Sequence, residues 1–546
     1  MVVSEAVGRA LAQLGVRTVF GLMGSGNLSV TNALRDAGAD FYAARHETAA
    51  VAMADGFARV SGELAAASVH QCPGLTNAIT GLTEAAKSRT PILLLAADVA
   101  ASALRSNFRV DQAGIVEGVG AVAERVHGPD TALADVARAV RRASVERRTV
   151  ALMLPLDVQS MAIADGPLVL PGGPDLTPPA PPAAVVAQLA GALRRAKAPA
   201  IIAGRGAVLA GAGDDLRRLA ELTGAVLATS AVANGLFAGD RYDLGISGGF
   251  ASPTAARLLA EADLVLAFGA TLNMWTTRHG ALVAEGAQVV QVDLDEDAIG
   301  AHRPVDMGIV ADAGIAAAAL VEALDGTPGE ELRSEALARE IAGGRWRDEP
   351  YEDTAADGTL DPRTLSIALD GMLPEERTVV VDSGHFMGWP SMYLRVPDPS
   401  GFVFAQAFQC VGLGLANAIG AAIARPDRLT VAAVGDGGVL LALGELETLG
   451  RLRLPMLVVV YNDGAYGAEV HHFRPMGMAV DLAQFPDTDF AALARAAGCE
   501  GVTARRVADL DAVRDWLGRR DGPLVLDAKV DPDICAEWLE EAFRGH

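Results

Sequence analysis

Short apolar segments alternate with segments of helical spacing along the whole chain. In the first third, apolar runs of strand length occur at residues 18–21, 64–69 and 92–97. The segments around them, in which apolar residues recur at helical intervals, are residues 4–14, 28–36, 46–61 and 76–88. Such alternation predicts a parallel β-sheet covered by helices on both faces.

The same alternation returns twice after interruptions. The stretch 167–182 is rich in proline, which suits neither helix nor sheet interiors, and residues 326–360 are acidic and carry an Arg/Glu-rich helix. We interpret both as linkers. Further strands are predicted at residues 200–203, 226–228, 264–268, 289–292, 378–381, 430–434, 456–461 and 524–527. The predicted fold class is α/β, with three doubly wound parallel-sheet domains at residues 1–165, 183–325 and 360–546.

Composition narrows the class of protein. With 51% hydrophobic residues among 546, the chain can bury several cores. It has no apolar run long enough to span a membrane and no signal-peptide pattern at the N-terminus, so we expect no membrane partner. The net charge of −23 would repel nucleic-acid phosphates, which excludes nucleic acid as an expected partner. The four cysteines form no CxxC pair and predict reduced thiols in a cytoplasmic protein.

A glycine-rich turn follows the predicted strand at 430–434. Gly435, Gly437 and Gly438 surround Asp436, and such a turn lets backbone amides approach phosphate oxygens. Asp463 comes 27 residues later, directly after another apolar strand. Oxygen donors at the carboxyl ends of neighbouring parallel strands can share one small hard cation such as Mg²⁺. The alternative is that these are two unrelated turns.

The turn Gly435-Asp436-Gly437 and the later Asn462-Asp463 pair resemble the diphosphate-binding signature of thiamine-diphosphate enzymes. The pattern is most similar to the group of acetolactate synthase, pyruvate decarboxylase and benzoylformate decarboxylase. The resemblance implies that Asp436, Asp463 and the Ala465 carbonyl bind Mg²⁺. Asp463 stands where this family usually has asparagine, so we expect an altered metal affinity or pH dependence.

The resemblance extends to the residues expected around thiamine diphosphate. In this family a large apolar side chain supports the bent cofactor, and Val411, 25 residues before Asp436, occupies that position, although valine is smaller than usual. Gln409 stands where glycine is common. The cofactor-binding residues expected in full are Gly384, His385, Gln409, Val411, Gly435, Asp436, Gly437, Gly438 and Tyr466.

Glu47 begins a run of small apolar residues, and we therefore expect it to be partly buried. Burial raises a carboxyl pKa, which suits a group that transfers a proton and takes it back. Residues 45–59 resemble the family motif that carries the activating glutamate. There the glutamate bonds the pyrimidine of the cofactor and promotes deprotonation of the thiazolium carbon. The alternative interpretation of Glu47 is a charge placed at a helix N-terminus.

Two further residues of the first domain are candidates for contact with the substrate. Ser25 and His70 match a serine and a histidine of benzoylformate decarboxylase, whereas residues 72–77 are closer to acetolactate synthases. His70 is a candidate for proton transfer, and its alternative role is structural.

The segment after Tyr466 offers more polar candidates. Glu469 matches an active-site glutamate of pyruvate decarboxylases, and His471 and His472 make this stretch more polar than in acetolactate synthases. The alternative is a solvated helix face.

The middle domain resembles the non-catalytic domain of the family at residues 263–270. Acetolactate synthases bind FAD there and often have arginine after the Gly-Ala pair, but this chain has Thr271, and Gly204-Arg205-Gly206 does not complete a dinucleotide fingerprint. FAD is therefore not expected, and the domain is interpreted as structural or as a vestigial nucleotide fold.

The resemblance implies a 2-oxo acid decarboxylase or an acetolactate-synthase-like carboligase, that is, a lyase or transferase, with small-molecule 2-oxo acids or aldehydes as substrates. The alternatives are a benzaldehyde-lyase-like enzyme, an acyl-CoA lyase and a catalytically dead homologue. The family resemblance also implies a homodimer or homotetramer with active sites between subunits.

Overall fold

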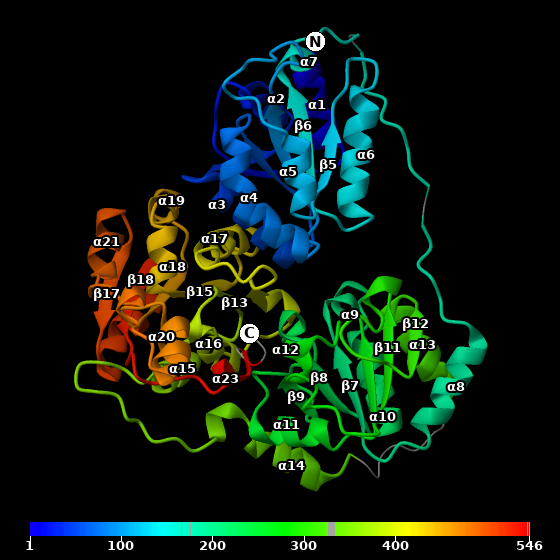
Figure 1. The fold of residues 1–546 in the computed structure, drawn as a ribbon, viewed down its shortest axis with the longest axis vertical. Helices are drawn as coiled ribbons and strands as arrows, with labels where there is room; N and C mark the ends of the chain where they lie inside the picture. The colour runs from blue at the N-terminus through cyan, green and yellow to red at the C-terminus, as the bar shows by residue number, and fades with distance from the viewer. Residues whose placement is uncertain (165, 175, 326–332, 543, 545–546) are drawn as a thin grey trace.

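Three six-stranded β-sheets, each flanked by helices, form the molecule (Figure 1). The computed structural model describes residues 1–164, 166–174, 176–325, 333–542 and 544. Every pairing between neighbouring strands is parallel. This confirms the predicted class of α/β domains with doubly wound parallel sheets.

The N-terminal domain alternates strands and helices. Its strands are β1 (Thr18–Gly21), β2 (Asp40–Ala43), β3 (Ala65–Val69), β4 (Ile92–Asp98), β5 (Val122–Arg125) and β6 (Val150–Pro155). Its helices are α1 (Val3–Gln13), α2 (Leu28–Asp36), α3 (Glu47–Ser61), α4 (Pro73–Lys87), α5 (Gln112–Gly118), α6 (Ala132–Ser144) and α7 (Leu156–Gln159). The strand order β2-β1-β3-β4-β6-β5 places the apolar strands β3 and β4 in the centre.

The middle domain repeats this architecture. Its strands are β7 (Pro199–Ala203), β8 (Val226–Thr229), β9 (Asp243–Ile246), β10 (Leu264–Phe268), β11 (Gln288–Asp293) and β12 (Met307–Val310). Its helices are α8 (Ala183–Leu193), α9 (Arg205–Leu209), α10 (Gly213–Thr223), α11 (Pro253–Ala260), α12 (Met274–Thr277) and α13 (Ala313–Leu324). The order is β12-β11-β10-β7-β8-β9.

The C-terminal domain has the order β14-β13-β15-β16-β18-β17. Its strands are β13 (Arg377–Val381), β14 (Phe402–Phe404), β15 (Leu429–Gly435), β16 (Leu457–Asn462), β17 (Glu500–Ala504) and β18 (Leu524–Lys529). Its helices are α15 (Pro362–Met372), α16 (Gly388–Tyr393), α17 (Gly414–Ala424), α18 (Asp436–Leu441), α19 (Glu445–Leu452), α20 (Gly467–Phe473), α21 (Phe490–Ala496), α22 (Asp511–Leu517) and α23 (Trp538–Ala542).

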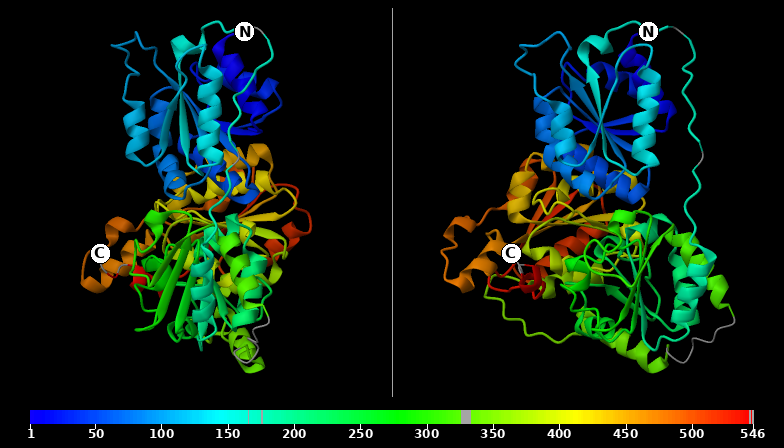
Figure 2. Two further views of the ribbon diagram at one scale, coloured as in Figure 1. Left: turned by 90° about the vertical axis from the view of Figure 1, so that its right-hand side faces the viewer. Right: turned by 45° about the vertical axis from the view of Figure 1, so that its right-hand side comes forward.

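The proline-rich stretch is extended, as predicted. Residues 166–174 and 176–182 contain no helix or strand, and the chain runs here along the outside of the molecule from the N-terminal to the middle domain (Figures 1 and 2). The second predicted linker carries helix α14 (Glu335–Gly343). Its first part, residues 326–332, lies outside the described residues.

Each predicted strand is present, with bounds that differ by at most two residues. The fourth predicted helix begins three residues earlier than expected because Pro73 fits its first turn. The unpredicted strands include short edge strands, such as β2 and β17, whose residues are largely half-buried. Half-buried edge strands lack the continuous apolar run that marks a central parallel strand.

The N-terminal and C-terminal domains share one hydrophobic core, in which α3 packs on α17 (Figure 1). A Cβ atom at Gly56 would lie 2.1 Å from the Asn417 carbonyl oxygen, and one at Gly420 would lie 1.9 Å from the Met53 carbonyl oxygen. Glycine at both positions therefore permits close helix packing. Residue numbers run in opposite directions along this contact, so the two helices are antiparallel.

Among the described residues, no helix has the length and apolar character needed to cross a membrane.

Candidate active site

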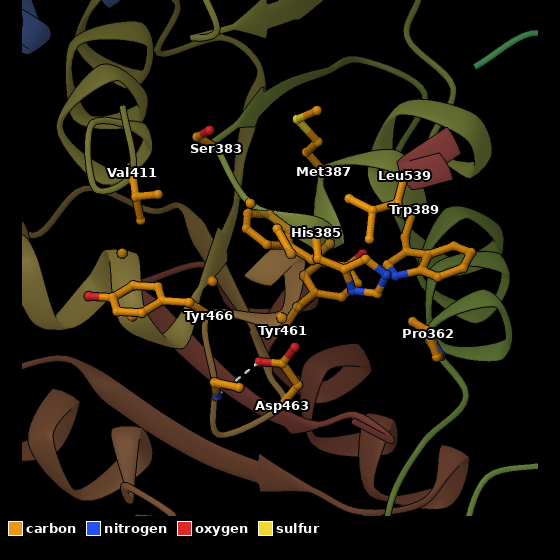
Figure 3. A pocket seen from close by; sticks show the side chains of 18 of the residues that line it. Pro362, Ser383, His385, Met387, Trp389, Val411, Tyr461, Asp463, Tyr466 and Leu539 are labelled. Carbon is orange, nitrogen blue, oxygen red and sulfur yellow. Dashed lines mark hydrogen bonds between the residues drawn. The ribbon is translucent and has the colours of Figure 1, made fainter. Parts of the chain in front are cut away.

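A cavity of about 340 Å³ opens at the carboxyl edge of the C-terminal sheet (Figure 3). It is lined by residues that follow five of the six strands, which is where open parallel sheets bind ligands. The predicted residues that line it are Gly384, His385, Gln409, Val411, Gly435, Asp436, Gly437, Gly438, Asp463, Ala465, Tyr466 and Glu469. Strand register thus brings together residues from four separate segments.

Asp436 and Asp463 lie at the ends of the neighbouring strands β15 and β16. The Asp436 carboxylate accepts hydrogen bonds from the Gly437 amide and, across the strand ends, from the Gly464 amide, both at 2.8 Å. Asp463 accepts a bond of 3.2 Å from the Ala465 amide. These bonds fix two acidic side chains at one edge of the cavity.

The electrostatics of this pair favour a bound cation. Burial raises the pKa of both carboxyl groups, and the charge of Asp436 raises the pKa of Asp463 further. Two carboxylates that are desolvated together are stabilised when a cation neutralises them. Carboxylate and carbonyl oxygens are hard donors, so the set Asp436, Asp463 and Ala465 fits Mg²⁺.

The glycines beside Asp436 are required by close packing. A Cβ atom at Gly437 would lie 2.6 Å from the Tyr466 ring, and one at Gly438 would lie 2.6 Å from an Asp382 carboxylate oxygen. No larger residue fits without displacing these groups. No side chain therefore covers the backbone of the turn on the side of the cavity, and a phosphate-binding turn needs such an accessible backbone.

Asp382 is a buried residue that the sequence analysis did not select. Its carboxylate accepts hydrogen bonds from the Ser383, Gly412 and Leu413 amides at 2.9–3.2 Å. Burial raises its pKa to about 6, while these backbone bonds oppose the increase. Asp382 thus anchors the turn that carries Val411. Its position directly after an apolar strand was the available signal.

Gln409 adopts a left-handed backbone conformation, with φ of 58°. This explains why glycine is common at the position, since a Cβ atom is strained there.

We expect Gln409→Gly to raise the free energy of unfolding of the cofactor-free protein by about 1 kcal/mol, because the strain is relieved. Thermal or denaturant unfolding measures the effect. Gln409→Ala is the matched control, since it retains the Cβ atom and should not stabilise the protein. Equal stabilisation by both variants would contradict the strain argument.

His385 lies in the middle of the cavity wall (Figure 3). Its Nε2 atom accepts a hydrogen bond of 2.8 Å from the Ala536 amide, and its ring centroid lies 4.4 Å from that of His471. Burial, and then His471, lower the pKa of His385 to about 3. His385 is therefore neutral and, because Nε2 accepts, it carries its proton on Nδ1.

The ligand atoms of His385, His471 and Cys535 lie within 4.8 Å of one another. A metal ion needs an imidazole lone pair, but the lone pair of His385 already faces the Ala536 amide. We therefore assign no metal ion to this cluster. His472 packs against Phe473, and neither His471 nor His472 lines the cavity.

The candidates of the N-terminal domain form a second group. Glu47 is half-buried and accepts a hydrogen bond of 3.1 Å from Asn77. The charge of Glu47 acts on His70, whose pKa is lowered by burial and raised by this carboxylate. His70 accepts a bond of 3.2 Å from the Gly26 amide, which places the Ser25 loop beside it, and packs against Phe108. The structure thus brings Glu47, His70 and Ser25 into one neighbourhood.

This second group does not line the cavity of its own chain. Because α3 and α17 are antiparallel, with Gly56 against Asn417 and Met53 against Gly420, Glu47 at the start of α3 lies toward the C-terminal end of α17. Val411 precedes the opposite end of α17. The two ends of this 11-residue helix are about 16 Å apart.

Comparison with known proteins identifies the family. Three family models of thiamine pyrophosphate enzymes match: the N-terminal TPP-binding domain at residues 1–115, the central domain at 186–320 and the C-terminal TPP-binding domain at 382–528. The chain belongs to the thiamine-pyrophosphate-dependent enzymes. The C-terminal match begins at Asp382 and includes the Asp436–Asp463 pair, and the N-terminal match includes Glu47.

Several curated relatives are similar over nearly the whole chain. Sulfoacetaldehyde acetyltransferase of Rhodobacter capsulatus is 30% identical, covering 100% of this chain and 96% of the relative. The enzyme of the same name from Castellaniella defragrans is 29% identical, covering 100% and 95%. Acetolactate synthase large subunit of Parasynechococcus marenigrum is 30% identical, covering 90% and 82%. This thiamine-pyrophosphate-dependent enzyme is therefore acetolactate-synthase-like in sequence.

The residues present fit the cofactor of this family. The glycine turn at 437–438 offers bare backbone to a diphosphate, and the oxygen donors beside it suit the accompanying Mg²⁺. Val411 lines the same cavity, on the side of Tyr466 and Ser383 (Figure 3). In a thiamine-pyrophosphate-dependent enzyme these groups would hold the diphosphate end and support the bend.

Proposed function

We propose that this chain is a Mg²⁺- and thiamine-diphosphate-dependent enzyme that removes carbon dioxide from a 2-oxo acid, alone or followed by carbon–carbon bond formation. The observation that carries the proposal is the pair of buried carboxylates, Asp436 and Asp463, beside a glycine turn at the carboxyl edge of the sheet. When bound, the cofactor supplies the carbanion chemistry, and the protein orients and polarises the reactants.

We also propose that each active site is formed by residues from two chains. Glu47, His70 and Ser25 of one chain would face the cavity of a second chain, because in their own chain Glu47 and Val411 lie toward opposite ends of α17. This arrangement requires at least a homodimer with two-fold symmetry, and a homotetramer would contain two such pairs.

Within this site the residues have separate roles. Glu47 would hold the pyrimidine of the cofactor and would give a proton to it or take one from it, and Val411 would support the cofactor from below. The groups proposed to exchange protons with the substrate are His70, which lies near the Glu47 carboxylate, and Glu469, which lies on the cavity wall. Ser25 contacts the substrate from the loop beside His70.

A screen of purified protein with thiamine diphosphate and Mg²⁺ tests the proposal. Product masses are measured for a panel of 2-oxo acids, each alone and with an aldehyde. We expect carbon dioxide release from at least one 2-oxo acid. A second candidate is the sulfoacetaldehyde acetyltransferase activity after which relatives at about 30% identity are named. Product formed from sulfoacetaldehyde, with no carbon dioxide from any 2-oxo acid, would favour that candidate.

The purified protein is expected to show no flavin absorbance and no activation by FAD. The two glycine turns of the middle domain touch each other, since a Cβ atom at Gly204 would lie 2.2 Å from the Gly269 carbonyl oxygen. A Cβ atom at Gly206 would lie 2.6 Å from the Gly269 Cα, so little space remains between the two turns for a dinucleotide phosphate. The visible spectrum of the protein measures the effect. A stoichiometric flavin band would overturn the expectation.

A further inference from the structure

Gln406 carries the most conspicuous unsatisfied group in the cavity. Both its amide nitrogen and its amide oxygen are inaccessible to solvent and have no hydrogen-bond partner, and the residue lines the cavity. A buried donor or acceptor without a partner is destabilising, and native structures contain few of them. An amide with both groups unsatisfied indicates a ligand that offers an acceptor and a donor together.

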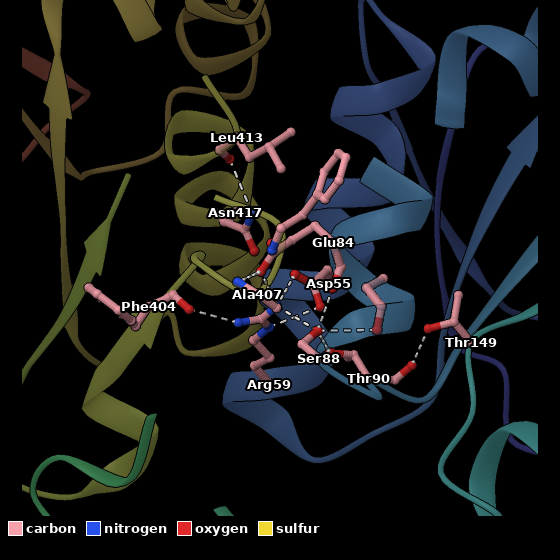
Figure 4. Close-up of polar contacts among 12 residues, drawn as sticks. Asp55, Arg59, Glu84, Ser88, Thr90, Thr149, Phe404, Ala407, Leu413 and Asn417 are labelled. Atoms are coloured by element: carbon pink, nitrogen blue, oxygen red, sulfur yellow. Dashed lines mark hydrogen bonds and ion pairs between the residues drawn. The ribbon is translucent and has the colours of Figure 1, made fainter. Parts of the chain in front are cut away.

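The backbone around Gln406 is held firmly, so its position is not that of a loose loop (Figure 4). The Phe404 carbonyl accepts a bond of 3.0 Å from Arg59, and Glu84 accepts bonds of 3.1 and 2.7 Å from the Ala407 and Phe408 amides. Arg59 and Glu84 are themselves paired at 2.9 Å. The N-terminal domain thus fixes the segment on both sides of Gln406.

The charges around Gln406 restrict the ligand. Among the described residues that line the cavity there is no lysine or arginine, while Glu469 and Asp531 add negative charge to that of the metal-binding pair. Within this chain, a second anionic reactant would have no cationic partner in the cavity. The wall also includes Trp275 and Trp538, whose rings lie 6.3 Å apart, and these favour an apolar side chain.

We propose that Gln406 recognises a 2-hydroxy ketone, which forms when the enzyme joins the decarboxylated 2-oxo acid to an uncharged aldehyde. The carbonyl oxygen of this product would accept a hydrogen bond from the Gln406 side-chain N–H. The neighbouring hydroxyl of the product would donate a hydrogen bond to the Gln406 amide oxygen. A 2-oxo acid, in contrast, offers only acceptors. The inference rests on the proposed function and selects carboligation over simple decarboxylation.

The reaction balances without another reactant. The 2-oxo acid loses carbon dioxide as the bond between its carboxyl and carbonyl carbons breaks. A new bond joins that carbonyl carbon to the aldehyde carbon, and the aldehyde oxygen takes one proton from the solvent to become the hydroxyl group. Carbon dioxide and one 2-hydroxy ketone are the products, and no oxidant or reductant is needed.

The test measures the ratio of 2-hydroxy ketone to released aldehyde for the wild-type holoenzyme and Gln406→Leu, with a 2-oxo acid and either benzaldehyde or glyoxylate. We expect Gln406→Leu to lower this ratio on the order of tenfold or more, because leucine removes both proposed hydrogen bonds. Benzaldehyde should be the better acceptor for the wild type, because the negative carboxylate of glyoxylate is repelled by the acidic residues of the cavity wall. Thiamine diphosphate affinity should not change.

The thermal stability of the same variants separates a ligand contact from a structural role. Gln406→Leu should melt at or above the temperature of the wild type, since it loses no protein hydrogen bond. Gln291→Leu in the middle domain is the matched control, because Gln291 makes three bonds, to Ala270, Ala298 and Gly300. It should lower the melting temperature and leave the product ratio unchanged.

The outcomes are distinguishable. If the wild type consumes no 2-oxo acid, the proposed function fails and this inference fails with it. If it releases carbon dioxide but Gln406→Leu leaves the product ratio unchanged, or if glyoxylate is the better acceptor, only the inference is overturned. A loss of cofactor affinity in Gln406→Leu would assign the amide to the cofactor and also overturn it.

Discussion

Replacing Asp436 or Asp463 with alanine is expected to weaken thiamine diphosphate binding at fixed Mg²⁺ by on the order of 100-fold or more, since even indirect supports of a metal site are worth 10–100-fold. Each variant removes one protein oxygen from the octahedral shell of the ion, and only water can replace it. Asp463→Asn should retain cofactor binding and much of the activity. It keeps an oxygen donor and removes one charge from a pair whose carboxylates repel each other. A calorimetric titration with the cofactor measures all three variants.

The comparison between the two alanine variants is the control. If both aspartates hold the same ion, the two titrations should be similarly weak. If Asp463→Ala instead titrates like the wild type while Asp436→Ala does not, Asp463 is not a ligand. The preceding Asn462 would then be the candidate, although its amide already bonds Asp527 at 2.8 Å.

Glu47→Gln is expected to fold and to bind the cofactor but to lose most turnover. Glutamine keeps the shape of the side chain and the bond to Asn77, but it cannot exchange a proton with the pyrimidine. Proton exchange at the reactive carbon of the cofactor, followed by NMR, should slow by two orders of magnitude or more, the usual range for a lost acid–base group. An exchange rate equal to that of the wild type would remove Glu47 from the mechanism.

Mixing the two inactive variants tests whether the site combines two chains. In a mixed dimer of Glu47→Gln and Asp436→Ala, one site carries both defects and the other carries neither. Random reassembly should therefore restore about a quarter of the wild-type activity. No recovery after verified reassembly would place Glu47 and Asp436 of the same chain in one site.

The same feature of the sequence predicted the central strands and the part of the site in the C-terminal domain. Central parallel strands are continuous apolar runs, and functional residues of open sheets follow them directly, so Asp436 and Asp463 could be placed by position alone. The edge strands β2 and β17 lack this signal because they are only half-buried.

What the sequence did not predict depends on contacts between distant segments. Asp382 is important because its carboxylate faces the amides at 412–413, and Gln406 because nothing in the described chain bonds its amide. Asp382 does follow an apolar strand directly, as Asp436 and Asp463 do, but no second residue at a fixed spacing marks it, and Gln406 belongs to no spacing pattern. Likewise, the separation of Glu47 from the cavity follows from the direction of α3 on α17, which no pattern within either helix encodes.

The shared core of α3 and α17 has a consequence for synthesis of the protein. About 350 residues separate the end of α3 at Ser61 from the start of α17 at Gly414. At 5–20 residues per second, the ribosome needs on the order of 20–70 s to reach that helix after α3 has emerged. During this time the part of α3 that packs on α17, at Met53 and Gly56, has no partner from its own chain. We therefore expect chaperones, or a completed neighbouring chain, to cover this face of the nascent N-terminal domain until translation is nearly finished.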